Sequence, residues 1–254
     1  LLPRLRARYP DAPPVGTVRL RTTGVPESRL AESVADLIAD VAPLDVAFLP
    51  SLAGVDIRIT ANDLPPAAAS VALAQAQARF SERIGVAHFG GQGVVHAAVV
   101  GARLLERGWH VAFAESCTGG LAAKLMTDVP GSARYVHGGV VAYDNEVKIH
   151  VLGVTPEAIE QHGAVSEAVV CAMASNVRRV CRAECGVAVT GVAGPGGGSA
   201  DKPVGTVWIA VETPDGAHTR RLRVLGQRDD IRERSAVAAL ELLRRALLGQ
   251  VEAR

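Results

Sequence analysis

The stretch that decides the fold is VAFAESCTGGLAAKLMT, residues 111–127. The apolar run VAFA is typical of a buried strand, and a helix is expected after it. Between the two stand an acid, two hydroxyls, a thiol and two glycines, ESCTGG at 115–120. Such a strand-to-helix junction lies at the carboxyl edge of a sheet, where α/β folds usually bind ligands. The sequence therefore raises the question of which side chain does chemistry there.

The C-terminal half continues this pattern as an alternation of strands and helices. We expect helices over 94–108, 117–129, 165–181 and 229–249. Strands are expected over 109–115, 138–144, 186–192, 205–213 and 218–226, the last two as a hairpin. This alternation predicts an α/β fold, a sandwich with a mixed sheet, over a domain at 94–250.

The N-terminal part predicts a smaller α+β unit over residues 17–88. Its expected strands are 17–21, 45–50 and 55–61, and its helices are 29–42 and 65–85. HFGGQG at 88–93 is rich in glycine, so we interpret it as a hinge at the domain boundary. Residues 1–16, rich in arginine and proline, are interpreted as a tail or linker.

Composition excludes several classes of protein. The chain has 254 residues, with 27 basic and 26 acidic side chains, so a large nucleic-acid surface is disfavoured. No apolar run reaches the roughly 18–20 residues that span a bilayer, and no signal peptide is recognisable. We therefore expect a cytoplasmic protein without a membrane partner. The first residue is not methionine, so we expect the chain to continue a longer protein.

The cysteines and histidines do not predict a metal site. The cysteines are scattered, and no second cysteine or histidine pair completes a zinc-like spacing with Cys181 and Cys185. The cysteines are expected to be free, buried thiols in a reducing compartment. The seven histidines form no metal-binding pattern. We expect neither a metal nor a cofactor.

Lysine is rare in this chain. Only three of the 27 basic residues are lysines, namely Lys124, Lys148 and Lys202. Arginine stays charged, whereas a desolvated lysine can become a neutral base. Each lysine is therefore a candidate for work that arginine cannot do.

Four segments carry candidate chemistry, and each has a purely structural alternative. Ser116 or Thr118 could simply cap a helix. Lys148, at the end of YDNEVK (143–148), could be an exposed lysine on a short helix. The glycine-rich segment 190–205 could be a flexible hairpin connection instead of a ligand-binding loop. The arginines of RDDIRER (228–234) could form a solvated face or hold a phosphate.

A second set of four segments, taken together, resembles the C-terminal domain of the CinA (competence/damage-inducible protein) family. They are AESCTGG (114–120), PGSARYVHGGVVAYDNEVK (130–148), HGAVSEAV (162–169) and TGVAGPGGGSADKPVGTVW (190–208). The N-terminal RTTGVPESRLAE (21–32) is similar to the KH-like linking domain of long CinA proteins. The resemblance implies that a preceding ADP-ribose pyrophosphatase domain of those proteins is absent from this sequence.

The resemblance implies an activity and a mechanism. The family's C-terminal domain is a nicotinamide mononucleotide (NMN) deamidase, which hydrolyses NMN to nicotinic acid mononucleotide and ammonia. The match places Ser116 as the nucleophile and Lys148 as the general base, without a cofactor. It also implies a homodimer.

The resemblance assigns further residues to the site. Backbone N–H groups of Cys117, Thr118 and Gly119 are expected to hold the oxyanion. Substrate-binding roles fall on Tyr143, Thr190, Gly191, Gly194 and Arg232, with Arg232 near the phosphate. Lys202 is a weaker candidate for substrate contact, and Lys124 is expected to be solvated. Ala133 stands where many relatives have serine, which puts one hydroxyl contact in doubt.

Two other functions are weighed against the deamidase. A nucleotide-binding or scaffold role would keep the fold with little turnover, but the retained Ser116 and Lys148 argue against it. RNA binding through the KH-like part would need a GxxG loop, and 17–88 contains none.

Overall fold

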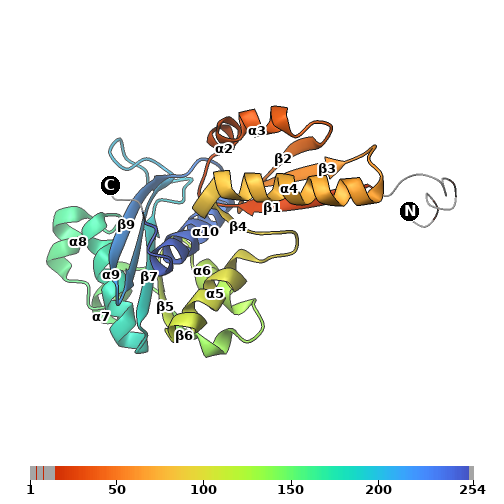
Figure 1. Ribbon diagram of the computed structural model, residues 1–254. Coiled ribbons are helices and arrows are strands. Elements are labelled where there is room, and N and C mark those ends of the chain that lie inside the picture. Colours follow the sequence, from red (N-terminus) through yellow and green to blue (C-terminus); the bar gives the residue numbers. More distant parts are fainter. Residues whose placement is uncertain (1–3, 5–7, 9–14, 252–254) are drawn as a thin grey trace. The chain divides into compact units, whose positions relative to one another are not determined.

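The computed structural model describes residues 4, 8 and 15–251, so most of the tail expected at 1–16 lies outside the described residues. The chain divides into two compact units, residues 1–94 and 95–254. The division follows Val94, and residues 88–90 of the expected hinge form a strand of the first unit. Figure 1 shows the elements of both units.

The first unit is a four-stranded antiparallel sheet with helices, in the strand order β2-β3-β1-β4. Its strands are β1 (Gly16–Thr22), β2 (Asp45–Ser51), β3 (Gly54–Ala61) and β4 (His88–Gly90). Its helices are α2 (Glu27–Ser33), α3 (Ala35–Asp40), α4 (Pro66–Ile84) and the short 3-10 helix η1 (Gly85–Ala87). The single helix expected at 29–42 is therefore wrong, because the backbone at Val34 leaves the helical conformation and separates α2 from α3.

The core of the first unit explains why these elements form. Alternate residues of β3 are buried, among them Ile57 and Ile59, which are fully buried. They pack with Leu20 of β1 and with Leu73 and Phe80 of α4. Period-two burial on a strand and a helical apolar stripe on α4 give the α+β unit that the sequence predicts.

The second unit contains a mixed five-stranded sheet in the order β6-β5-β7-β8-β9. β6, β5 and β7 are parallel, and β8 and β9 are antiparallel to their neighbours. The strands are β5 (Val111–Glu115), β6 (Val136–Val141), β7 (Cys185–Gly191), β8 (Thr206–Thr213) and β9 (Gly216–Arg223). The helices are α5 (His96–Arg107), α6 (Leu121–Thr127), η2 (Ser132–Arg134), α7 (Asn145–His150), α8 (Pro156–His162), α9 (Glu167–Cys181) and α10 (Arg228–Leu247).

Helices cover both faces of this sheet, which confirms the predicted α/β sandwich (Figure 1). Large side chains such as Phe113 point to the face covered by α5, α6 and α10. The opposite face carries small residues, among them Ala112 and Ala188, and packs against α9. A Cβ at Gly186 would lie 2.0 Å from the carbonyl oxygen of Ala174, so α9 lies directly on the strand. Because β5, β6 and β7 are parallel, their carboxyl ends meet at one edge.

Candidate active site

Ser116 lies directly after β5, at the carboxyl edge of the sheet. Its backbone N–H donates to the carbonyl oxygen of Val189 in β7 at 2.9 Å, which fixes the end of the strand. Ser116 also lines a cavity of about 250 Å³. The helix expected from residue 117 begins only at Leu121, because residues 117–120 form a turn. Gly120 has a φ of 98°, a left-handed conformation that favours glycine.

Glu115 caps α6 from the end of β5. Its buried carboxylate accepts hydrogen bonds from the backbone N–H groups of Gly120, Ala122 and Ala123, at 3.0, 3.1 and 2.8 Å. Within the described part of the chain, the hydroxyl of Thr118 is buried without a hydrogen-bond partner. The helix-cap alternative for the two hydroxyls is therefore not what the structure has, since Glu115 fills that role.

Glu115→Ala is expected to lower the free energy of unfolding of the second unit by about 1–3 kcal/mol, because it leaves three N–H groups of the α6 start without an acceptor. Trp109 and Trp208 both lie in the second unit, so tryptophan emission during urea titration reports its unfolding. Lys124→Ala, on the exposed side of the same helix, is the matched control and should stay within about 0.5 kcal/mol. An equal effect of the two variants would contradict the capping role.

The turn after Ser116 presents two backbone N–H groups. Among residues 15–251, those of Cys117 and Thr118 donate to no carbonyl oxygen, whereas the N–H of Gly119 donates to the Ser116 carbonyl at 3.1 Å. The N–H of Gly119, which we expected to hold the oxyanion together with the other two, is therefore already used within the turn. Arg232 of α10 holds the other side of these two residues: its Nε and Nη2 each lie 3.2 Å from their carbonyl oxygens.

Lys148 is buried on the short helix α7, with only 2% of its surface exposed. Its Nζ lies 3.4 and 3.5 Å from the carbonyl oxygens of Tyr143 and Asp144. No ion pair to Lys148 is found among the described residues. Burial lowers the pKa of Lys148, although the nearby carboxylate of Asp144 acts in the opposite direction. The alternative of an exposed lysine is therefore wrong.

Lys148 and Ser116 share one end of the sheet. β5 and β6 are adjacent and parallel, with Glu115 paired to Val141, so the segment after β6 runs beside the turn at Ser116. Cys117 is also close enough to the Lys148 amine to act on its pKa, which it raises. A neutral amine has two N–H groups for the two carbonyl oxygens and a lone pair left to accept a proton.

Arg228, at the start of α10, lines the cavity and joins two of its walls. Its Nη2 donates to the Tyr143 hydroxyl at 2.8 Å, and its Nη1 donates to the carbonyl oxygen of Gly194. Arg232, which we expected near the phosphate, is instead bonded to the turn after Ser116 and is not among the residues that line the cavity. Arg228 is thus the arginine that faces this space.

The glycine-rich loop forms another wall of the cavity, through Gly191, Gly194, Gly196 and Gly197. Gly194 has a φ of 76°, and a Cβ there would lie 2.6 Å from a methyl of Val204, so the position requires glycine. Thr190 does not line the cavity; its buried hydroxyl donates to the carbonyl oxygen of Ala164 at 2.9 Å.

Lys202 fastens the same loop from its outer end. Its ammonium donates to the carbonyl oxygen of His162 at 2.7 Å, whereas Lys124 is exposed and pairs with Asp128. Lys202 therefore lies on another cavity, described below, and not on the one at Ser116.

Cys117 is buried beside Ser116, and burial raises the pKa of its thiol to about 12. A thiol with that pKa carries almost no thiolate at neutral pH, so it is a poor nucleophile there. All four cysteines are free thiols, two buried and two partly exposed.

Residues 15–251 contain neither a metal-binding cluster nor a membrane-spanning helix. No group of three or more histidine, cysteine, aspartate or glutamate side chains is arranged to hold a metal ion. None of the helices described there has the length and apolarity needed to cross a membrane.

Sequence reasoning missed two residues of this site. Glu115 accepts hydrogen bonds from N–H groups five to eight residues further along the chain, across a turn. No sequence pattern describes such a contact. The sequence did indicate Arg228 as one of three candidates, because RDDIRER (228–234) places three arginines at the start of a helix. Only the packing of α10 against the loop and Tyr143 distinguishes Arg228 from its neighbours.

Comparison with known proteins agrees with this description. The family model described as the CinA C-terminal domain matches residues 94–247, and the one described as the damage-inducible protein CinA KH domain matches residues 17–90. A CinA-like protein of Gemmatimonas aurantiaca is 44% identical over 247 residues. A putative competence-damage inducible protein of Symbiobacterium thermophilum is 41% identical over 245 residues. The alignments cover 97% and 93% of this chain but 58% of each relative.

Solved structures are similar to part of this chain. The competence/damage inducible protein CihA from Agrobacterium tumefaciens is 41% identical, with a TM-score of 0.58 over 60% of this chain and 93% of that one. A competence or damage-inducible protein from Enterobacter asburiae is 32% identical, with a TM-score of 0.58 over 60% of this chain and 96% of that one. With its C-terminal and KH domains both matched, the chain belongs to the CinA family.

Proposed function

We propose that this chain hydrolyses the carboxamide of nicotinamide mononucleotide, giving nicotinic acid mononucleotide and ammonia by a serine–lysine mechanism. The observation that supports it most is the buried Lys148, without an ion pair in the described part of the chain, at the same sheet edge as Ser116. Amide hydrolysis by serine needs such a base, an oxyanion site and a proton for the departing ammonia.

The proposed reaction gives a role to each of these groups. The Ser116 oxygen attacks the carboxamide carbon while the neutral Lys148 amine takes the serine proton. The N–H groups of Cys117 and Thr118 stabilise the oxyanion. The C–N bond then breaks, and the Lys148 ammonium returns its proton to the leaving ammonia. Lys148 then deprotonates a water molecule that attacks the resulting ester, and it returns this proton to the Ser116 oxygen as the acid leaves.

Arg228 supports the proposal that the substrate carries a phosphate. The guanidinium has five N–H donors, and two of its nitrogens contact the Tyr143 hydroxyl and the Gly194 carbonyl. Its positive charge at the cavity suits an anionic group. Arg232 then acts on the same substrate indirectly, because it holds the peptide groups of Cys117 and Thr118 in place.

The direct test is ammonia release from NMN by the purified chain, with Lys148→Arg measured beside it. The parent should release ammonia and the variant should not, because arginine stays charged and cannot be the neutral base. Substantial activity of Lys148→Arg would mean that the lysine supplies only charge. Absence of release by the parent, despite an intact fold, would favour nucleotide binding without turnover.

Asp144→Asn is expected to move the acidic limb of the rate profile to lower pH. Rate requires neutral Lys148, so it rises with pH through the pKa of this lysine. The carboxylate of Asp144 raises that pKa, and asparagine removes the charge while it can still cap α7. The measurement is kcat against pH, with Glu146→Gln, an exposed carboxylate two residues away, as the control. A limb that stays in place or moves to higher pH would contradict this assignment.

A further inference from the structure

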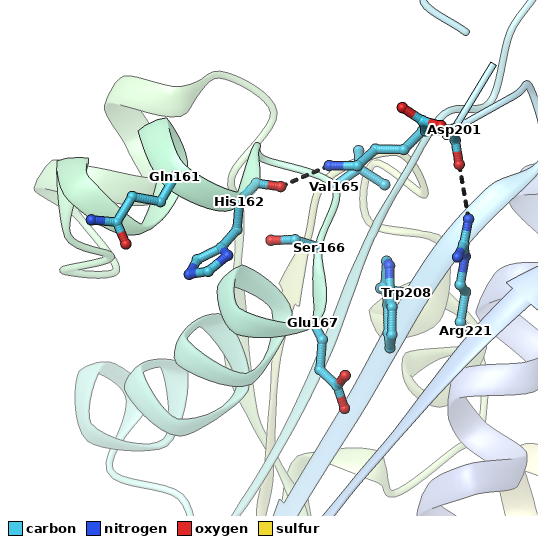
Figure 2. A pocket seen from close by; sticks show the side chains of 9 residues that line it. Gln161, His162, Val165, Ser166, Glu167, Asp201, Trp208 and Arg221 are labelled. Carbon is cyan, nitrogen blue, oxygen red and sulfur yellow. Dashed lines mark hydrogen bonds between the residues drawn. The ribbon is translucent and has the colours of Figure 1, made fainter. Parts of the chain in front are cut away.

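A second and larger cavity, of about 380 Å³, lies on the α9 face of the sheet. It is bounded by the end of α8, the start of α9, the strands β8 and β9, and the outer end of the glycine-rich loop. In Figure 2, His162 approaches from α8, Glu167 from α9, and Trp208 from the sheet. The volume falls within the range of small-molecule sites in proteins.

The indole of Trp208 gives this cavity its largest flat surface. Trp208 in β8 is paired with Arg221 in β9, so both side chains stand on the same face of the sheet. Val165 supplies an aliphatic surface to the same space. A partly exposed tryptophan beside an aliphatic side chain is a surface on which a planar ring can stack.

The charged groups around the cavity balance. Lys202 and Arg221 bring two positive charges, and Glu167 and Asp201 bring two negative charges. These walls are also held in place by hydrogen bonds: Lys202 to the His162 carbonyl at 2.7 Å, and Arg221 to the Asp201 carbonyl at 2.9 Å. A balanced, ordered lining suits a ligand with polar edges and no large net charge.

We propose that this second cavity binds an uncharged planar heteroaromatic ring of the nucleobase class, stacked on Trp208. Stacking on tryptophan provides affinity for any such ring, and the side chains of Gln161 and His162 offer donors and acceptors for its edges. This inference does not rest on the proposed deamidase activity, because none of these residues belongs to the cavity at Ser116.

The two cavities share one structural element. Gly194, Gly196 and Gly197 line the cavity at Ser116, whereas Asp201 and Lys202 of the same loop line the second one. The base of the loop is closed by reciprocal backbone hydrogen bonds, from Val192 to Thr206 and from Gly205 to Val192. Binding at the second cavity therefore has to be separated experimentally from binding at the first.

The test is a titration of the whole chain with adenosine, an uncharged nucleoside, followed by tryptophan emission. The background carries Trp109→Phe, so that Trp208 is the sole tryptophan reporter. Saturable quenching is expected. Val165→Phe fills the cavity beside Trp208 and should weaken binding by about tenfold or more, a loss comparable to that of one stacking contact. Tyr143→Ala, at the first cavity, is the matched control and should leave the binding curve unchanged.

Two further arms complete the experiment. Trp208→Leu keeps an apolar side chain against the sheet but removes the stacking surface, and calorimetry should show the same loss of adenosine binding as Val165→Phe. Adenosine monophosphate should bind within a few-fold of adenosine, because the lining is neutral overall. Absence of saturable quenching, or quenching that Tyr143→Ala weakens and Val165→Phe does not, would overturn the proposal. Binding of the monophosphate alone would equally overturn it, in favour of a phosphate site.

Discussion

Ser116→Ala is expected to reduce ammonia release from NMN by a factor of about 10⁴ or more, with the fold unchanged. The substitution removes the attacking oxygen. The backbone hydrogen bonds that fix residue 116 remain, because its N–H still donates to the Val189 carbonyl and its carbonyl still accepts from the Gly119 N–H. Lys148→Ala should cause a loss of similar size, because the serine then has no base. The measurement is initial rate at saturating NMN, together with the circular dichroism of each variant.

Cys117→Ala is the matched control for the nucleophile. Its thiol is adjacent to Ser116 in the chain and lines the same cavity. Because burial raises the pKa of this thiol to about 12, it stays protonated at neutral pH, and Cys117→Ala should retain most activity. An inactive Cys117→Ala beside an active Ser116→Ala would show that the nucleophile is assigned wrongly.

Glu241→Ala is expected to lower the free energy of unfolding of the second unit by about 3–5 kcal/mol, because it removes a buried carboxylate that accepts hydrogen bonds from two buried arginines. Glu241 of α10 is 2% exposed and accepts hydrogen bonds from Arg244 and Arg245, with distances of 2.7–2.8 Å, and it contacts His96 of α5 at 3.0 Å. Both arginines are themselves buried.

Urea titration followed by tryptophan emission measures this loss. Glu106→Ala, which removes an exposed ion pair with Arg103 on α5, is the control and should cost less than about 1 kcal/mol. A Glu241→Ala protein within about 1 kcal/mol of the parent would show that α10 tolerates the loss of this carboxylate.

The Glu241 carboxylate also makes the stability of the second unit depend on pH under acidic conditions. Burial alone would raise the pKa of Glu241, but hydrogen bonds from His96 and the two arginines outweigh it and lower the pKa from 4.5 to about 2. A lowered pKa stabilises the fold above pH 4.5, and this stabilisation is lost as the pH falls from 4.5 towards 2. Glu241→Gln should therefore lose less stability than the parent over that interval.

Sequence alone predicted the sandwich because its strands and helices carry strong local signals. Buried strands such as VAFA and GVAVTG, separated by long helices, leave few alternatives to a sheet covered on both faces. The helix α8 was missed, although Thr155 caps it and Pro156 opens it, both standard signals for a helix start. Its seven residues were too few to show an apolar period.

The candidate site was predictable only in part. Ser116 could be placed at a sheet edge from the chain itself, because the strand before it and the glycines after it are local features. The burial of Lys148, the cap by Glu115 and the contacts of Arg228 all depend on packing between segments far apart in the sequence or across an irregular turn. Such contacts have no fixed spacing, so no periodicity could have revealed them.

The scarcity of lysine makes the burial of Lys148 directly observable. The chain has only three side-chain amines, and Lys124 is largely exposed whereas Lys148 is almost fully enclosed. An amine-directed acylating reagent should therefore label Lys124 rapidly and reach Lys148 only when the segment around α7 opens locally. The ratio of the two labelling rates then measures how often the site opens to solvent, in a protein that carries no probe other than its own residues.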